Sequence, residues 1–420
     1  MNPITLNSEQ QSAVDYISQH ILENSGGSLV LKAPAGCGKS TCMSFVLDQV
    51  QGKRIAATAP TNKAVKVLSE MVGNRSHTTC TIHKLLGLQL LPSGEIKRIS
   101  GKNRQTNFQD LDGIIIDEAG MLNKELMGYI EEAGAENPHL TWTFVGDAYQ
   151  LPPVMESHSK VWEIEDQIEL KRVMRTDNQI LTLATRVRNL IAEGSVGALD
   201  LREDFDDKGG VYKPAKLLDS LLEDAEGLRT GEAKGVAWRN ATVQAMNFAV
   251  RKVLLPDDWH RSSYWPTDRI TLLEPARNTK DELLGATDDE FVISRVEVTH
   301  HPIFCYLTIY KLFAISEFSG AEVEFWVLHE SSKEEFDKRL KALASAAKQD
   351  PRGWASYWNF KECVHYLRHA YAVTAHKSQG STYQRAYVNW RDIMLNPRRE
   401  EALRCLYVAV SRPKHKLYFG

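Results

Sequence analysis

The sequence has no long apolar run, no C-x-x-C pair and no excess of one charge. No stretch is apolar over the roughly 20 residues that a membrane-spanning helix needs, and the N-terminus lacks the basic start and apolar core of a signal peptide. We therefore expect a cytoplasmic protein that contacts no membrane. Its 420 residues suffice for two or three domains, and 43% hydrophobic and 25% charged residues are typical of a globular chain.

The six cysteines are scattered, and the absence of a C-x-x-C pair argues against a disulfide framework or a zinc ribbon. His300, His301 and Cys305 come closest to a metal cluster. Neighbouring residues on a strand point to opposite faces, and a structural zinc site needs four convergent ligands, so we expect no metal there.

The net charge of −3 does not by itself predict a nucleic-acid binder, but the charge is unevenly distributed. Residues 51–110 carry ten basic against three acidic side chains, and residues 361–420 carry eleven against four. Residues 200–232 carry ten acidic against five basic side chains. This pattern favours a basic groove on an acidic body, with solvated helix faces as the alternative.

A phosphate-binding loop is predicted near the N-terminus. Residues 28–32 form a short apolar run, residues 33–38 are small, and an amphipathic helix is predicted from Lys39 to about residue 50. Strand, small-residue turn and helix N-terminus are the context that such a loop needs. Ala33 replaces the first glycine of the G-x-x-x-x-G-K-S pattern, at a position that supports the turn more than it contacts phosphate. A chance match in a loop is the alternative.

Each residue type in this loop has a predicted task. Gly36 and Gly38 let backbone N–H groups approach phosphate oxygens closely. Lys39 would reach the β- and γ-phosphates of ATP, and Ser40 would hold Mg²⁺ through its hydroxyl.

Two carboxylates follow a second apolar run. Residues 114–116 are isoleucines that predict a buried strand, and Asp117 and Glu118 come directly after them. Ligands in open α/β sheets bind at the carboxyl ends of strands. We therefore expect Asp117 to bind Mg²⁺ and Glu118 to act as general base on the attacking water. The alternative is an exposed acidic turn.

Further polar residues follow apolar runs in both halves of the chain. Gln150 is a candidate γ-phosphate sensor, and Arg175 is a candidate arginine finger, although an isolated arginine is more often a surface residue. Residues 406–410 predict an apolar strand that ends close to Arg412, a second candidate finger. This part of the chain indicates a second α/β domain that faces the nucleotide of the first.

Nine segments in order carry a family resemblance. They read LNSEQ, APAGCGKST, APTNKAVKVL, TIHKLLG, IIIDEAG, VGDAYQLPPV, LKRVMR, VTAHKSQGST and LYVAVSRPK. The series resembles the motif set of superfamily-one helicases. Its order resembles the 5′-to-3′ branch, which includes the RecD-like, Pif-type and phage Dda helicases, with Dda as the nearest likeness.

The resemblance implies an α/β fold of two RecA-like P-loop domains with ATP between them. The first would span residues 1–175, with a β-hairpin insert, the pin, at about 86–108. The second would comprise residues 176–254 and 370–420. Residues 255–369 would form an inserted SH3-like β-barrel with helices.

Two inserted segments have predicted details. The pin would split the duplex with Leu91 and Pro92 at its tip, or be a mere surface hairpin. In the barrel insert, four or five strands are predicted before helices at 333–348 and 354–368. On the second helix core packing is favoured over a nucleic-acid surface for four aromatic residues, Trp354, Tyr357, Trp358 and Phe360.

The resemblance also assigns site residues. Gln10 would read the adenine. The nucleotide-binding residues would be Gln10, Ala35, Gly36, Cys37, Gly38, Lys39, Ser40, Thr41 and Gly380. The single-stranded DNA contacts would be Pro60, Thr61, Asn62, Lys63, Thr81, His83, Thr374, His376, Lys377 and Ser378. Several of these lie in the two basic stretches, which agrees with contacts to DNA phosphates.

We therefore expect an ATP- and Mg²⁺-dependent DNA helicase that moves 5′ to 3′ on single-stranded DNA and unwinds duplexes in replication, recombination or repair. Its partners would be single-stranded DNA and duplex junctions, with replication proteins or a single-strand-binding protein as candidates. It would act as a monomer, in the host cytoplasm if a phage encodes it. The alternatives are a P-loop ATPase or kinase acting on a small molecule, and a non-catalytic nucleic-acid binder.

Overall fold

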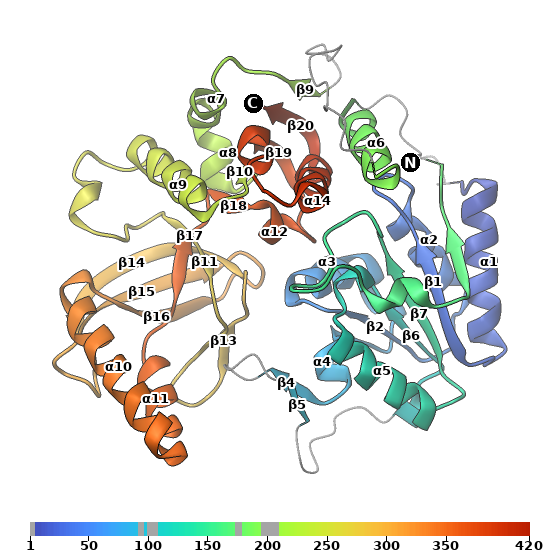
Figure 1. Cartoon of the computed structure of the whole chain (residues 1–420), viewed down its shortest axis with the longest axis horizontal. Helices are drawn as coiled ribbons and strands as arrows, with labels where there is room; N and C mark the ends of the chain where they lie inside the picture. Colours follow the sequence, from blue (N-terminus) through green and yellow to red (C-terminus); the bar gives the residue numbers. More distant parts are fainter. Residues whose placement is uncertain (1–4, 91–95, 99–107, 173–178, 195–209) are drawn as a thin grey trace. The chain divides into compact units, whose positions relative to one another are not determined.

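The computed structural model describes residues 5–90, 96–98, 108–172, 179–194 and 210–420. It forms two compact units (Figure 1). Unit 1 comprises Met1–Pro214 and Ser378–Gly420, and unit 2 comprises Ala215–Lys377. Within the described residues, no helix has the length and apolarity needed to cross a membrane.

Unit 1 is built on a six-stranded parallel sheet with the strand order β3-β2-β6-β7-β1-β8. The strands are β1 (Gly27–Lys32), β2 (Ile55–Ala59), β3 (Thr78–Thr81), β6 (Gly113–Ile116), β7 (Thr141–Gly146) and β8 (Gln167–Glu169). β2, β6 and β7 are buried along their whole length, as expected when helices cover both faces of a parallel sheet.

Alternate residues of each strand enter two separate cores. Leu29 and Leu31 of β1 face the core formed with α1, α2 and α3, whereas Val30 faces the core formed with α4 and α5. The helices are α1 (Ser8–Leu22), α2 (Lys39–Gln49), α3 (Asn62–Val72), α4 (Ile82–Leu85) and α5 (Lys124–Glu136). The α/β fold predicted from the sequence is confirmed.

The rest of unit 1 comes from distant parts of the chain. A short antiparallel pair, β4 (Leu88–Leu90) and β5 (Ile96–Arg98), occupies the predicted pin. Near the C-terminus, β20 pairs in parallel with β19 and β9. These elements are α6 (Gln179–Ala192), β9 (Val211–Tyr212), β19 (Tyr383–Val388), α13 (Trp390–Ile393), α14 (Arg399–Val410) and β20 (Pro413–Phe419).

The strand predicted for residues 406–410 is wrong, because these residues form the last turns of α14. Every residue from position 405 to position 410 is buried, so α14 is covered on all sides there and α6 packs against it. A short apolar run of this kind shows no period that separates a buried helix from a buried strand.

Unit 2 combines a parallel pair of strands with an antiparallel sheet. β10 pairs in parallel with β18, near α7, α8 and α9. The antiparallel sheet has five strands in the order β16-β15-β14-β11-β17. The elements before it are α7 (Leu217–Glu223), α8 (Ala225–Thr230), β10 (Ala233–Ala237) and α9 (Asn240–Leu254), and those after it are β18 (Ala372–Thr374) and α12 (Ala375–Ser378).

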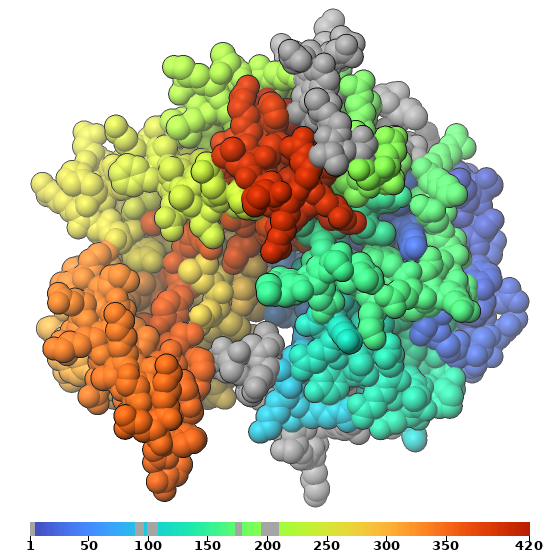
Figure 2. Space-filling view, in the orientation of Figure 1, coloured from blue at the N-terminus to red at the C-terminus, as the bar shows by residue number. Residues whose placement is uncertain are grey.

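The antiparallel sheet has its own apolar core, which includes Phe291 and Phe325. Its strands are β11 (Arg269–Leu272), β14 (Glu290–His300), β15 (Thr308–Ser316), β16 (Glu322–Leu328) and β17 (Leu367–His369), and β12 (Ala276–Arg277) pairs with β13 (Leu283–Gly285). The helices α10 (Lys333–Gln349) and α11 (Trp354–Lys361) form an exposed surface (orange in Figure 2).

The predicted helix 354–368 is too long. α11 ends at Lys361, and residues 367–369 instead pair with β11. The aromatic residues of α11 divide between two roles. Phe360 is buried against Phe336, whereas Trp354, Tyr357 and Trp358 contact one another and remain partly exposed.

Candidate functional site

The predicted phosphate loop joins β1 to α2, and its backbone favours glycine at two positions, Gly36 and Gly38, which both have a positive φ. Gly38, the N-cap of α2, has a φ of 86°, which glycine adopts without steric cost. A Cβ atom there would lie 2.3 Å from Nε2 of Gln10. Lys39 then opens α2, whose free N–H groups and dipole favour an anion.

Gln10 holds this loop from α1. Its Nε2 donates to the carbonyl of Cys37 at 2.9 Å, and its Oε1 accepts from the N–H of Asn7 at 3.0 Å. The side chain is buried. The structure thus places the residue predicted to read adenine directly against the phosphate loop, with Ser40 and Thr41 in the first turn of α2.

Lys39 brings the two predicted carboxylates together. Its Nζ lies 2.9 Å from Oδ1 of Asp117 and 3.2 Å from Oε1 of Glu118. Burial opposes the charge on Lys39, but the two carboxylates outweigh it and raise the pKa of the ammonium. Burial also opposes the charge on Glu118, yet Lys39 and Arg412 lower the pKa of that carboxyl. Lys39 and Glu118 are therefore both ionised at neutral pH.

Glu118 has a backbone conformation that is rare outside glycine. Its φ and ψ are 51° and 36°, and its N–H donates to Oδ1 of Asp117 at 2.8 Å. A non-glycine residue in this region stores on the order of 1 kcal/mol or more, and such residues concentrate at functional sites. This turn lets two consecutive carboxylates reach the same ammonium.

The loop after β7 adds two buried polar side chains, Asp147 and Gln150. β7 is the parallel neighbour of β1, with Gly146 opposite Lys32, so this loop starts beside the phosphate loop. Burial raises the pKa of Asp147. The amide Oε1 of Gln150 has no hydrogen-bond partner among the described residues.

α14 and the residues after it reach the same edge. The hydroxyl of Tyr407 donates to Asp147 and accepts from the N–H of Ala35 in the phosphate loop. Arg404 donates to two carbonyls of the loop after β7. The C-terminal segment therefore contacts both loops directly.

Arg412, a predicted finger, is held by its own neighbours. It donates to the carbonyl of Val408 at 3.0 Å, to that of Ser381 at 3.2 Å and to Oγ of Ser411 at 2.8 Å. Only 8% of it is exposed. Its charge still lowers the pKa of Glu118, so the guanidinium lies within electrostatic reach of the carboxylates.

Four residues of this site were not predicted: Asp147, Arg188, Arg404 and Tyr407. The charge of Arg188 on α6 opposes the effect of burial, which raises the pKa of the Cys37 thiol. Cζ of Arg188 lies 5.9 Å from the ring centroid of Tyr149. Tyr407 lies in an apolar run, and Arg404 has charged residues nearby. The local composition therefore does not identify either residue as part of a functional site. The one available signal is their spacing of three, which places both on one face of a helix.

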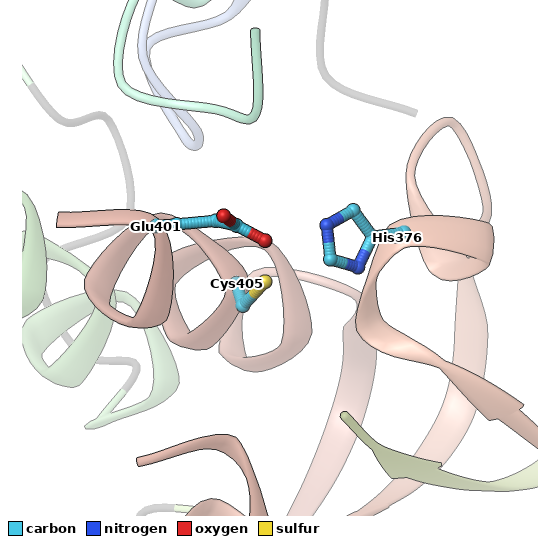
Figure 3. Close-up of side chains that lie close together, drawn as sticks. All are labelled: His376, Glu401 and Cys405. Atoms are coloured by element: carbon cyan, nitrogen blue, oxygen red, sulfur yellow. The ribbon is translucent and has the colours of Figure 1, made fainter. Parts of the chain in front are cut away.

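A cysteine on α14 is buried beside a glutamate. Cys405 lies one turn after Glu401 on the same helix (Figure 3). It is fully buried, and burial raises the pKa of its thiol to about 12. The side chain is therefore a thiol at neutral pH.

In unit 1, two of the predicted DNA contacts are helix N-caps. Oγ1 of Thr61 accepts from the N–H of Ala64, and Oγ1 of Thr81 accepts from the N–H of Lys84, both at 3.2 Å. β2 and β3 are parallel neighbours with Ala59 opposite Thr81, so α3 and α4 begin at the same sheet edge. The remaining predicted contacts flank these caps, namely Pro60, Asn62, Lys63 and His83.

In unit 2, residues 374–377 repeat the arrangement of residues 81–84. Both segments read T-x-H-K, follow a strand and start a short helix. Oγ1 of Thr374 accepts from the N–H of Lys377 at 3.3 Å. His376 is exposed on α12, which ends at Ser378.

Some predicted residues have other environments or cannot be placed. Arg175, Leu91 and Pro92 lie outside the described residues. Gly380, with a φ of 71°, lies just after α12. His301, from the segment considered for a metal, is engaged through both ring nitrogens by backbone groups, including the carbonyl of Cys363.

Two protein families match the chain. The AAA domain matches residues 5–208, which contain the phosphate loop and both carboxylates. The UvrD-like helicase C-terminal domain matches residues 369–419, which contain α14 and Arg412.

Individual relatives match over nearly the whole length. The ATP-dependent DNA helicase Dda of Enterobacteria phage T4 is 23% identical over 458 residues, covering 98% of each chain. A structure of two coordinating Pif1 helicases at forked double-stranded DNA aligns with a TM-score of 0.55 and 16% identity, covering 99% of this chain and 92% of the other. The structure of Bacteroides Pif1 with ADP-AlF3 and single-stranded DNA aligns with a TM-score of 0.52 and 14% identity, and the coverage of both chains is the same. The shared fold is that of two RecA-like domains.

Proposed function

We propose that the chain, a superfamily-one helicase that resembles Dda, is an ATP-driven motor that moves 5′ to 3′ along single-stranded DNA and unwinds duplexes. The observation that carries the proposal is the cluster of Lys39, Asp117 and Glu118, on which Arg412 acts electrostatically. A phosphate loop, a carboxylate pair and a cation from a distant segment are the parts that phosphoryl transfer from ATP requires. Dda, which is similar to this chain over nearly its whole length, is a DNA helicase, and this supports DNA as the substrate along which the motor moves.

The chemistry follows from the charges of the cluster. Lys39 would exchange its carboxylate partners for the β- and γ-phosphates of ATP. The hydroxyl of Ser40 and the carboxylate of Asp117 are hard oxygen donors of the kind that hold Mg²⁺, an ion that would neutralise charge on the phosphates. Glu118, kept ionised by Lys39 and Arg412, would accept a proton from the attacking water.

Three further side chains would act on the γ-phosphate. Gln150 is buried, and its amide oxygen has no partner among the described residues. That oxygen would accept a hydrogen bond from the attacking water, while the amide nitrogen would donate to the γ-phosphate. Arg412 and Arg175 would act as arginine fingers that stabilise charge in the transition state. Gln10, which supports the phosphate loop, would read the adenine at the same time.

The DNA contacts would lie at helix N-termini. Thr61, Thr81 and Thr374 each cap a helix that starts where a strand ends. Backbone N–H groups and a hydroxyl together suit a backbone phosphate, which carries no base identity. At Thr61 the dipole of the eleven-residue helix α3 adds to this. This mode of contact fits a motor that must bind any sequence.

The remaining features of the proposal concern architecture and setting. We assign residues 1–175 to the first RecA-like domain, 176–254 with 370–420 to the second, and 255–369 to an SH3-like insert. The antiparallel pair β4–β5 would belong to the strand-separating pin. The protein would act as a cytoplasmic monomer on single-stranded DNA and duplex junctions, alongside replication proteins or a single-strand-binding protein.

The test measures ATP hydrolysis with and without single-stranded DNA. The wild type should be strongly stimulated by DNA. Lys39→Ala should lower the stimulated rate by about 10²-fold or more, because no other cation replaces its phosphate contact. Glu118→Gln should lower it by about 10²- to 10⁴-fold while nucleotide and DNA still bind, since only the base is removed.

The control is Lys53→Ala, which removes a lysine of unit 1 that pairs with Asp112. Its stimulated rate should match that of the wild type. Wild-type turnover that ignores DNA would favour the small-molecule P-loop enzyme instead. Full activity of Lys39→Ala would remove the phosphate-loop assignment.

A further inference from the structure

One tyrosine joins three segments that lie far apart in the sequence. The hydroxyl of Tyr407 donates to Oδ2 of Asp147 at 2.7 Å and accepts from the backbone N–H of Ala35 at 3.0 Å. Only 1% of Tyr407 and 4% of Asp147 are exposed. The hydroxyl proton of Tyr407 and one lone pair of its oxygen are thus both used in hydrogen bonds, in a buried environment.

Arg404 strengthens this link from the same face of α14. Its Nη1 donates to the carbonyls of Ala148 and Gln150 at 2.8 and 2.9 Å, and its Nε donates to Glu400 at 3.1 Å. α14 therefore holds the loop with Asp147 and Gln150 through two side chains. A shift of α14 must move this loop or break these bonds.

The electrostatics show that the hydroxyl matters for Asp147. Burial raises the pKa of this carboxyl, and the hydrogen bond from Tyr407 opposes that effect. Lys39 and Glu118 also act on Asp147, with opposite signs. A buried carboxylate that loses one of few donors is penalised strongly, so the hydroxyl stabilises the charged form.

The N–H of Ala35 belongs to the phosphate loop, in which backbone N–H groups receive phosphate oxygens. This N–H has one proton, which it donates to the hydroxyl oxygen of Tyr407. A phosphate oxygen that takes this N–H must displace or weaken the bond to Tyr407. Nucleotide binding would then change the position of Tyr407, and with it the hydrogen bond to Asp147 and the position of α14. Arg412 follows α14 closely in the sequence.

We propose that Tyr407 is a positioning residue that couples the phosphate loop to the Asp147 loop and to α14. The inference rests on the proposed function, because it assumes ATP in the phosphate loop. Tyr407 does not itself take part in the chemistry. It sets the position of α14, and through α14 that of Arg412, according to the partner of Ala35.

The test variant is Tyr407→Phe, which keeps the buried ring and removes only the hydroxyl. With saturating DNA, kcat for ATP should fall by about 10- to 100-fold, the range expected for one hydrogen bond to a charged group. KM for ATP should stay the same or fall, because a competitor for the N–H of Ala35 is gone. The melting temperature should stay within a few degrees of that of the wild type.

The matched control is Tyr387→Phe. Tyr387 is equally buried in unit 1, but its ring stacks on Tyr418. The control should retain the wild-type kcat. In a double-mutant cycle, Asp147→Asn should cost much less in the Tyr407→Phe background than alone, since both changes break the same bond.

Several outcomes would overturn the inference: an unchanged kcat in Tyr407→Phe, a change in KM alone, an equal loss in Tyr387→Phe, or fully multiplicative losses in the cycle. A fall in kcat that tracks a lowered melting temperature would show a merely structural role. If the wild type lacks DNA-stimulated hydrolysis, the proposed function fails first, which is a separate result.

Discussion

Residues 81–84 in unit 1 and residues 374–377 in unit 2 have nearly the same sequence and the same local structure. Each reads T-x-H-K, follows a parallel strand and starts a short helix that the threonine caps. The two lysines, however, differ in their surroundings. Lys84 is exposed, whereas Nζ of Lys377 lies 2.5 Å from Oδ1 of Asp288.

The difference shows that the charge around a capped helix N-terminus depends on residues far away in the sequence. Four residues suffice to specify a capped helix N-terminus, because the threonine accepts a hydrogen bond three residues along the chain. The net charge of that N-terminus depends on Asp288, which is 89 residues from Lys377. We therefore infer that residues 81–84 contribute more to DNA affinity than residues 374–377.

The largest effect is expected when the positive charge of residues 81–84 is removed. Lys84→Ala should weaken single-stranded DNA binding about tenfold at low salt, and should reduce the slope of log affinity against log salt by about 0.7, the value of one single-strand phosphate contact. Lys377→Ala should change both quantities less, because that ammonium is already neutralised. Fluorescence anisotropy across a salt series measures both. A larger slope change in Lys377→Ala would reverse the comparison.

The chemical cluster was predictable from the sequence for the same local reason as the caps. Lys39 follows a strand through a turn of small residues, and Asp117 and Glu118 directly follow another strand. Because parallel strands end at one sheet edge, three residues at such positions lie close together without further information. The observed distances of 2.9 and 3.2 Å agree with that reasoning.

Contacts between distant segments were not predictable in this way. The partners of Tyr407 are separated from it by 372 and 260 positions, and neither spacing nor residue type marks the pairs. The helix at residues 406–410 was predicted as a strand for a related reason. Its residues are buried on every side, so the sequence carries no amphipathic period there.

The second prediction tests what the two segments share. Thr81→Val and Thr374→Val keep the side-chain shape but remove the capping oxygen. Each should lower the free energy of unfolding by about 1 kcal/mol, the typical value of such a cap. Urea denaturation of both variants measures this. Similar losses would support equivalent caps, whereas no loss at either site would mean that the cap bonds contribute nothing.

The third prediction makes the two segments more alike. Asp288→Asn removes the charge that neutralises Lys377, and asparagine tolerates the φ of 66° at this position. Single-stranded DNA affinity should rise about threefold, in line with the modest energy of a partly exposed ion pair. The matched control is Asp281→Asn, another left-handed aspartate of unit 2, which pairs with Arg277. An equal gain in the control would point to overall charge as the cause.

The smallest effect concerns the histidine of the first segment. Burial lowers the pKa of His83, so the folded protein binds a proton there less readily than the unfolded chain does. Stability from this residue is therefore fully present above the ordinary histidine pKa and is lost as the pH falls through and below it. His83→Gln should reduce the pH dependence of the free energy of unfolding between about pH 7 and 5 by at most one proton. Part of the wild-type slope should remain, because burial also lowers the pKa of His301 and His365 in unit 2. Urea denaturation at a series of pH values measures the slopes, and a variant slope equal to that of the wild type would show that His83 titrates alike in both states.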